Sequence, residues 1–189
     1  MRVDIRPEDY RSLAHYASVP SRFEVRERVD VAALDEYGTT LPVQSVTRPW
    51  IKDYDAIPSN DPLSWSTRFD VRPWTFLAAF ADGRRVGGGI VVADQSVVSL
   101  GGRTDCSLLW DLRVAPEWRR HGIATALLRA VDDAAGAAGS TGVDVETQDT
   151  NVAACRLYAA SGYTLRDIDS AAYPDLPGET RLIWTKLFA

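Results

Sequence analysis

From residue 73 onward the chain alternates between strand-like and helix-like hydrophobic patterns, and this order strongly limits the folds open to it. Two apolar runs joined by Asp82-Gly83 indicate a hairpin, because that dipeptide suits the tight turn between two strands. The segments that follow are a strand at 107–114, a helix at 122–139, a strand at 142–148, a helix at 151–162, and strands at 163–169 and 180–188. This β-β-β-α-β-α-β-β order predicts an α/β (α+β) fold in which helices cover a mixed sheet.

The first 72 residues differ in character, with short elements interrupted by prolines. Residues 3–17 are predicted to form a strand followed by a helix, and residues 22–31 show the alternation of a strand. Residues 39–62 contain four prolines and are predicted to be extended or looping chain. Because 189 residues suit a single domain, we expect residues 1–72 to elaborate the domain formed by residues 73–189.

The charge balance is mildly acidic, with 26 Asp and Glu against 21 Lys and Arg and a net charge of −5. This balance provides no general attraction to nucleic acid or to an anionic membrane, so neither is expected as a partner. The N-terminus lacks the apolar run of a signal peptide, and no apolar stretch reaches ~20 residues, which predicts a cytoplasmic protein. Cys106 and Cys155 are too few for a disulfide framework, and with His15 and His121 far apart no metal site is expected.

Residues 118–127, WRRHGIATAL, place two arginines, a histidine and a glycine at the start of a predicted helix. The first N–H groups of a helix have no partners within it and the helix dipole adds positive potential, so such an end binds anions. Gly122 leaves the backbone open to a phosphate, and Arg119 and Arg120 could add charged donors. Taken alone, the same pattern also fits a solvated basic turn before a surface helix.

The pattern R-x-x-G-x-A at Arg119, Gly122 and Ala124 resembles the acyl-CoA-binding motif of the GNAT N-acetyltransferase superfamily. A second segment, Asn151-Val-Ala-Ala-Cys-Arg-Leu-Tyr-Ala-Ala-Ser-Gly-Tyr163, is similar to the superfamily's N-x-x-A-x-x-x-Y-x-x-x-G-[FY]. The order and the separation of the two motifs match as well. Finer features, including LWDLRVAPEWRRHG and AAYPDLP, resemble the streptothricin acetyltransferases within that superfamily.

This resemblance implies the GNAT fold, with a mixed central sheet of about six or seven strands flanked by helices. In that fold the two central strands, here 107–114 and 142–148, part to admit the cofactor. The resemblance also implies one domain over residues 1–189, with an acetyl-CoA-binding core at 73–189 and a variable acceptor-side region at 1–72.

Acetyl-CoA is the cofactor that the resemblance implies. Its pyrophosphate would lie on the amides at the helix start, and its pantetheine arm would pair with the end of strand 107–114 like an added strand. Taken alone, Asn151 also fits a helix cap and Tyr158 a core aromatic residue. The predicted cofactor-binding residues are Leu112, Arg113, Val114, Arg119, Arg120, His121, Gly122, Ile123, Ala124, Thr125, Asn151, Ala154 and Tyr158.

The superfamily transfers the acetyl group directly to an amine, which requires an acid for the departing thiolate and a base for the acceptor ammonium. The resemblance makes Tyr158 the acid. Asp111 and Glu146 lie in the two central strands, where a carboxylate must be paired or face a cleft, so each is a candidate base or contact for the ammonium. The alternative role is an ion pair, and Arg113 is the obvious partner of Asp111. Tyr173 is a candidate for the wall of the acceptor site.

Three functions fit these residues. The first is acetyl transfer to a primary amine of a small molecule, such as a streptothricin-like antibiotic, without a covalent enzyme intermediate. The alternatives are a protein or peptide N-acetyltransferase and a non-catalytic acyl-CoA-binding regulatory module. Tyr158 together with the two carboxylates disfavours the regulatory module, and a long N-terminal region that roofs a small pocket disfavours a peptide acceptor. A monomer and a homodimer are both compatible with the sequence.

Overall fold

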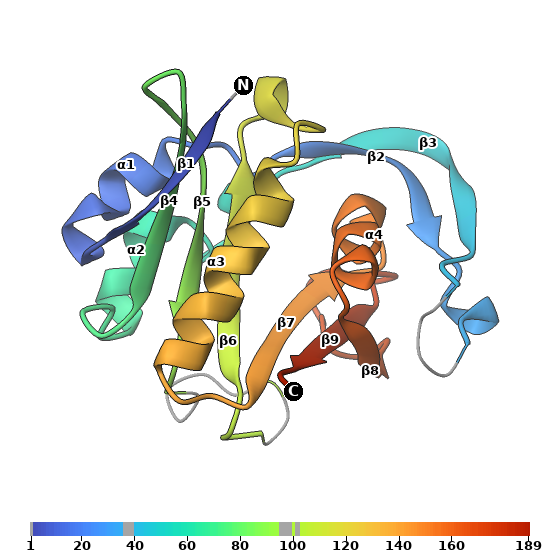
Figure 1. Cartoon of the computed structure of the whole chain (residues 1–189). Helices are drawn as coiled ribbons and strands as arrows, with labels where there is room; N and C mark the ends of the chain where they lie inside the picture. Colours follow the sequence, from blue (N-terminus) through green and yellow to red (C-terminus); the bar gives the residue numbers. More distant parts are fainter. Residues whose placement is uncertain (1, 36–39, 95–99, 101–102) are drawn as a thin grey trace.

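The computed structural model describes residues 2–35, 40–94, 100 and 103–189. A seven-stranded mixed sheet with the order β1-β4-β5-β6-β7-β9-β8 forms the centre of this described part (Figure 1). β6 and β7 pair in parallel, and all other neighbours in the sheet pair antiparallel. The strands of this sheet are β1 (Val3–Glu8), β4 (Thr75–Ala81), β5 (Arg84–Val92), β6 (Ser107–Val114), β7 (Gly142–Gln148), β8 (Thr164–Asp169) and β9 (Arg181–Leu187).

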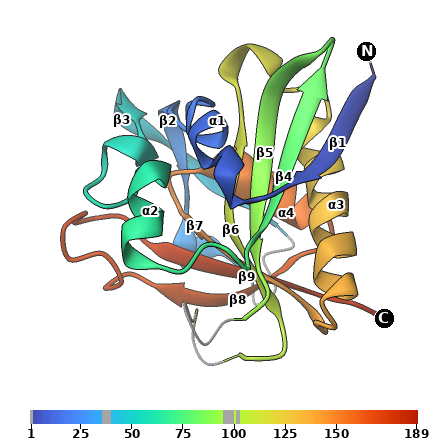
Figure 2. The same cartoon turned by 90° about the vertical axis from the view of Figure 1, so that its left-hand side faces the viewer.

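Helices cover both faces of the sheet (Figures 1 and 2). α1 (Leu13–Ala17) and α2 (Pro62–Arg68) pack on one face, here called the α1 face. α3 (Ile123–Ala137) and α4 (Val152–Ala160) pack on the other, the α3 face. Each face has its own hydrophobic core, because the strands alternate apolar side chains to both sides. The sheet therefore separates two hydrophobic layers.

The element order predicted after residue 73 is confirmed, since the chain forms β4, β5, β6, α3, β7, α4, β8 and β9 in turn. Within the proline-rich segment, β3 (Val43–Lys52) is extended as predicted and pairs with β2 (Phe23–Val29) in a separate two-stranded sheet. Pro49 is tolerated there because it lies where the register of the two strands shifts. The helix α2 was not predicted. Its start fits the chemistry of the segment, since the Asp61 side chain accepts the Leu63 N–H and a proline occupies the first turn.

The central strands β6 and β7 are paired at one end and separate at the other. Their pairing joins Ser107–Leu109 to Val143–Val145, and the described residues include no partner on the β7 side for the rest of β6. β6 stays paired with β5, but the register shifts between Ile90 and Val91, which leaves Trp110 as the extra residue of a β-bulge. Because a bulge bends the strand that carries it, β6 turns away from β7 at this point. The predicted parting of the two central strands is confirmed.

The glycine run Gly87–Gly89 in β5 permits close packing beside β6. A Cβ atom on Gly88 would lie 2.6 Å from the carbonyl oxygen of Leu77 and 2.7 Å from the ring of Tyr16. Such distances are too short for any side chain, so the glycine is needed for the ring of Tyr16 to pack this closely against β5. The missing side chain lets Tyr16, on α1, reach the next strand, β6.

Candidate active site

The loop between β6 and α3 forms an open cradle of backbone N–H groups. Arg120 and Gly122 adopt left-handed backbone conformations, with φ of 64° and 77°. No side chain among the described residues caps the start of α3, so the N–H groups of its first turn remain available. A Cβ on Gly122 would meet no described atom within 4 Å, so the space in front of the cradle is open. Free donors, the helix dipole and open space fit the pyrophosphate of acetyl-CoA. The predicted residues Arg119, Arg120, His121, Gly122, Ile123, Ala124 and Thr125 all lie on this loop and first turn.

The side chain of Arg119 is directed into the fold. Its Nε donates to the carbonyl oxygen of Val114 at 3.0 Å, and its Nη2 donates to that of Arg22 at 2.8 Å. Burial lowers the pKa of this half-buried guanidinium. Arg119 therefore fastens the loop to the end of β6, while Arg120 and His121 remain exposed at the cradle.

α4 brings Asn151 and Tyr158 to the α3 face. Asn151 caps the helix, since its Oδ1 accepts the Ala154 N–H at 3.2 Å, as the cap alternative predicted. Tyr158 is 5% exposed, and its hydroxyl makes no hydrogen bond to any described residue. Burial raises the pKa of Tyr158, with further contributions from Tyr54 and Asp111. A neutral phenol with an unengaged hydroxyl fits the role of a proton donor.

Asp111 lies on the α1 face and is already engaged. Its Oδ2 accepts the Tyr16 hydroxyl and the Arg113 Nε, both at 2.6 Å. The buried Arg113 guanidinium also contacts both oxygens of Asp55, at 3.1 and 3.2 Å. Burial opposes the charge of Arg113, but the carboxylates beside it outweigh this and raise its pKa. The alternative predicted for Asp111, an ion pair with Arg113, is therefore present, and two carboxylates share one guanidinium.

Glu146 on β7 is in a different environment. Its Oε1 accepts the Tyr173 hydroxyl at 2.8 Å, and it forms no ion pair within 4.0 Å among the described residues. Burial raises the pKa of Glu146, and the hydrogen bond from Tyr173 opposes part of that rise. A half-buried carboxyl group without a paired cation is a suitable base for an ammonium near neutral pH.

The carboxylates and the cradle lie on opposite faces of the sheet. Asp111 contacts Tyr16 of α1, and Glu146 is the cross-strand partner of Ile183, which belongs to the core under α1 and α2. Tyr158 belongs to the core under α3 and α4. β6 and β7 no longer pair between the two faces, and the charge of Asp111 contributes to the raised pKa of Tyr158 from across the sheet.

Three residues of this site were not predicted, and all come from the first 72 residues. Tyr16 bonds Asp111, and Asp55 bonds Arg113. Tyr54 donates its hydroxyl to the Oε1 of Gln148 at 2.5 Å, at the end of β7. No motif or spacing in the sequence distinguishes these residues, because their contacts arise only when the N-terminal region folds over the sheet.

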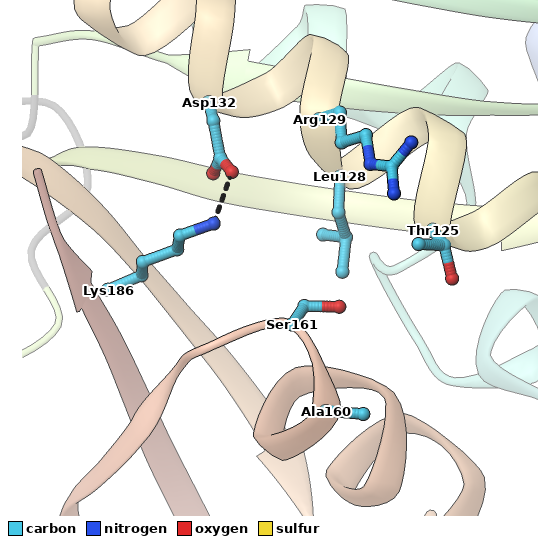
Figure 3. Close-up of a pocket in the computed structure, with 7 residues that line it drawn as sticks. All are labelled: Thr125, Leu128, Arg129, Asp132, Ala160, Ser161 and Lys186. Atoms are coloured by element: carbon cyan, nitrogen blue, oxygen red, sulfur yellow. Dashed lines mark hydrogen bonds and ion pairs between the residues drawn. The ribbon is translucent and has the colours of Figure 1, made fainter.

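A separate pocket of about 230 Å³ lies between α3 and the end of α4 (Figure 3). The Lys186 Nζ and the Asp132 Oδ2, 2.6 Å apart, form an ion pair at its wall. Among its lining residues, Thr125 is the one predicted to bind the cofactor. The pocket therefore adjoins the start of α3 and lies away from the carboxylates of the α1 face.

The described part of the chain contains neither an exposed thiol nor a cluster of metal-ligating side chains. No group of three or more His, Cys, Asp or Glu side chains in it is arranged to hold a metal ion. Cys106 and Cys155 are buried, and burial raises the pKa of Cys155 to about 12, which keeps it an uncharged packing residue. None of the described helices has the length and apolar character needed to cross a membrane.

A model of the Acetyltransferase (GNAT) family matches residues 43–163, which is more than half of the chain. The parted central strands and the cradle at α3 agree with that match. The chain belongs to the GNAT acetyltransferase family and is an enzyme of the acetyl-CoA-dependent acetyltransferase class.

Within this family the chain is similar to the streptothricin acetyltransferase of Escherichia coli. The two are 29% identical over 188 residues, which cover 97% of this chain and 94% of that protein. A crystal structure of a proposed streptothricin acetyltransferase of Bacillus anthracis strain Ames, in complex with acetyl coenzyme A, matches with a TM-score of 0.77, 20% identity and 100% of both chains. The crystal structure of nourseothricin acetyltransferase matches with a TM-score of 0.72, 20% identity and 99% of both chains.

Proposed function

We propose that this enzyme transfers the acetyl group of acetyl-CoA to a primary amine of a small cationic molecule of the streptothricin type. The amine attacks directly, without a covalent enzyme intermediate. The observation that carries the proposal is the placement of Asp111 and Glu146 on the α1 face, opposite the cradle and Tyr158 on the α3 face. Similarity to the streptothricin acetyltransferase of Escherichia coli along nearly the whole chain supports the choice of acceptor.

The charge of the acceptor side favours a cationic substrate. Asp55 and Asp111 share the single guanidinium of Arg113, so one negative charge remains there. Glu146 is held by a neutral phenol, that of Tyr173, and adds a second. An ammonium entering between them gains favourable electrostatic interactions that a neutral or acidic molecule lacks.

The two carboxylates have environments suited to different tasks. The Oδ2 of Asp111 is bonded to Arg113, whereas its Oδ1 makes no hydrogen bond to a described residue, so Oδ1 is suited to hold the acceptor ammonium. Burial raises the pKa of Glu146, which suits a group that must accept a proton from that ammonium. We therefore assign Glu146 as the base and Asp111 as a substrate contact.

The donor side holds a proton at the Tyr158 hydroxyl. Acetyl-CoA, when bound, supplies an activated thioester. The cradle at residues 119–125 fits its pyrophosphate, and the stretch of β6 at Leu112 and Val114, which has no β7 partner and whose Val114 carbonyl oxygen also accepts from Arg119, fits its pantetheine. Burial keeps Tyr158 protonated, so it is suited to act as the acid for the departing sulfur. A proton thus leaves the amine on the α1 face and another is delivered on the α3 face.

The test is a panel of amines assayed by release of the free CoA thiol, with mass analysis of the acetylated product. The panel includes streptothricin, aminoglycosides, polyamines and short peptides. We expect turnover with streptothricin and weaker or no turnover with peptides. Activity confined to peptides would overturn the small-molecule assignment, and acetyl-CoA binding without turnover of any amine would favour a regulatory module.

A further inference from the structure

A short turn of the N-terminal region links the two central strands beyond the point where they part. This turn, η3 (Tyr54–Ala56), follows β3 and precedes α2. Asp55 contacts the guanidinium of Arg113 on β6, and Tyr54 donates to Gln148, the last residue of β7. Two consecutive residues therefore connect strands that no longer share backbone hydrogen bonds at that level.

Neighbouring side chains hold Tyr54 in place. Its ring packs on Phe23 with the ring centroids 5.6 Å apart, and the Nζ of Lys52 lies 5.7 Å from its centroid. Its carbonyl oxygen accepts the Asn60 Nδ2 at 3.0 Å. The buried ion pair between Lys52 and Glu179, at 2.6 Å, ties the preceding residues to the segment before β9. These contacts hold the Tyr54 hydroxyl in place at the end of β7, where β6 and β7 no longer pair.

That hydroxyl also bonds Asn151, the residue predicted to contact the cofactor. The Nδ2 of Asn151 donates to the Tyr54 hydroxyl at 3.3 Å, and the Oδ1 of Asn151 accepts the Ala154 N–H at 3.2 Å. The two contacts fix both ends of the amide group. One N–H and one lone pair of the Asn151 side chain remain unused, and these are what an amide of pantetheine requires.

We infer that Tyr54 is a positioning residue that acts through Asn151 to hold the amide in the orientation that binds the pantetheine of acetyl-CoA. This inference rests on the proposed function for the donor, acetyl-CoA, and on the sequence-based prediction that Asn151 contacts it. It adds a second donor-side role for the N-terminal region, besides the contact of the Arg22 carbonyl oxygen with Arg119. Tyr54 makes its contacts without the acceptor, so its effect is measurable in the binding of acetyl-CoA alone.

The test is a double-mutant cycle on the dissociation constant of acetyl-CoA, measured by equilibrium titration of the full chain without acceptor. Tyr54→Phe keeps the packed ring and removes the hydroxyl, and we expect it to raise the Kd about fivefold, the effect of one neutral hydrogen bond. Asn151→Ser removes the amide while keeping a capping hydroxyl, and it should raise the Kd by at least as much. Tyr54→Phe added to Asn151→Ser should change the Kd by less than about twofold further, because the two act as a unit.

The matched control is Tyr10→Phe, because the Tyr10 hydroxyl makes no hydrogen bond to a described residue and should leave the Kd unchanged. Thermal melting of each variant shows whether it folds. An unchanged Kd in folded Tyr54→Phe, or effects of the two substitutions that multiply in the double variant, would overturn the inference. A failure of the amine panel would leave this cycle intact, whereas wild-type protein that does not bind acetyl-CoA would refute both proposals.

Discussion

Replacing Glu146 by glutamine tests the assignment of the base with little risk to the fold. Glu146 forms no ion pair among the described residues, and its Oε1 accepts the Tyr173 hydroxyl at 2.8 Å. Glutamine has the same size, and its Oε1 can accept the same hydrogen bond. The substitution therefore removes the ability to take a proton and preserves the packing.

The size and pH dependence of the effect follow from the role of a base. General base catalysis contributes about 10²–10⁴-fold, so kcat should fall at least about 100-fold while the KM for acetyl-CoA changes little. A base acts when deprotonated, so wild-type kcat/KM should fall as the pH decreases through the raised pKa of Glu146. That acidic limb should lie above the ordinary glutamate value of about 4.3 and disappear in Glu146→Gln. Tyr173→Phe should move the limb to higher pH, because the Tyr173 hydrogen bond lowers the pKa of Glu146.

The raised pKa also sets the sign of the effect on stability. The folded state binds the Glu146 proton more tightly than the unfolded state, so this group favours folding most at acid pH. That contribution is lost as the pH rises through the folded-state pKa. Glutamine stays neutral, so the Tm of Glu146→Gln should not fall below the wild-type value at mildly alkaline pH.

The assay is the initial rate of CoA thiol release with the preferred amine across the pH range, alongside thermal melting. Glu24→Gln is the matched control, because Glu24 forms an exposed ion pair with Arg26 on β2. The control should retain the wild-type rate and pH profile. Full turnover and an unchanged acidic limb in Glu146→Gln would refute the assignment of Glu146 as the base.

Four further substitutions test the rest of the site. Gly122→Val forces a β-branched residue to a φ of 77°, a strain of about 1–2 kcal/mol or more, and should raise the Kd of acetyl-CoA at least about tenfold. Arg120 is exposed, so Arg120→Ala should change the Kd of acetyl-CoA less than about threefold. A larger loss of affinity in Arg120→Ala than in Gly122→Val, measured by titration, would contradict the backbone cradle. Tyr158→Phe should lower kcat about 10-fold or more without lowering the Tm, and full turnover would exclude it as the acid. Asp111→Asn removes one of the two carboxylates that pair with the buried Arg113, while Asp55 remains. The free energy of unfolding from thermal melting should therefore fall by about 2 kcal/mol, and an unchanged Tm would contradict this network.

The features predictable from the sequence are those that depend on local pattern. The strands and helices after residue 73 follow from hydrophobic period, and the cap at Asn151 follows from its position before a helix. The parting of β6 and β7 was predicted from the family resemblance and not from the local pattern. Its local cause is the bulge at Trp110, which no sequence pattern indicates.

The contacts of the N-terminal region could not be predicted, because they join residues far apart in the chain. Tyr16 and Asp111 are separated by 95 positions, and Tyr54 and Asn151 by 97. The side chain of Arg119 was expected near phosphate, but it contacts carbonyl oxygens instead. It does so because the loop folds back on the end of β6, which brings the Val114 carbonyl oxygen within reach. Backbone donors at the helix start, which depend little on residue type, are left to form the cradle.

The most direct test of the proposed function is a single assay with purified protein, acetyl-CoA and streptothricin, in which CoA thiol release and the mass of the product are followed together. The proposal predicts thiol release that depends on both substrates, with one acetyl group added to an amine of the antibiotic. Binding of acetyl-CoA without acetylation of streptothricin, together with acetylation of a peptide N-terminus or lysine, would contradict it.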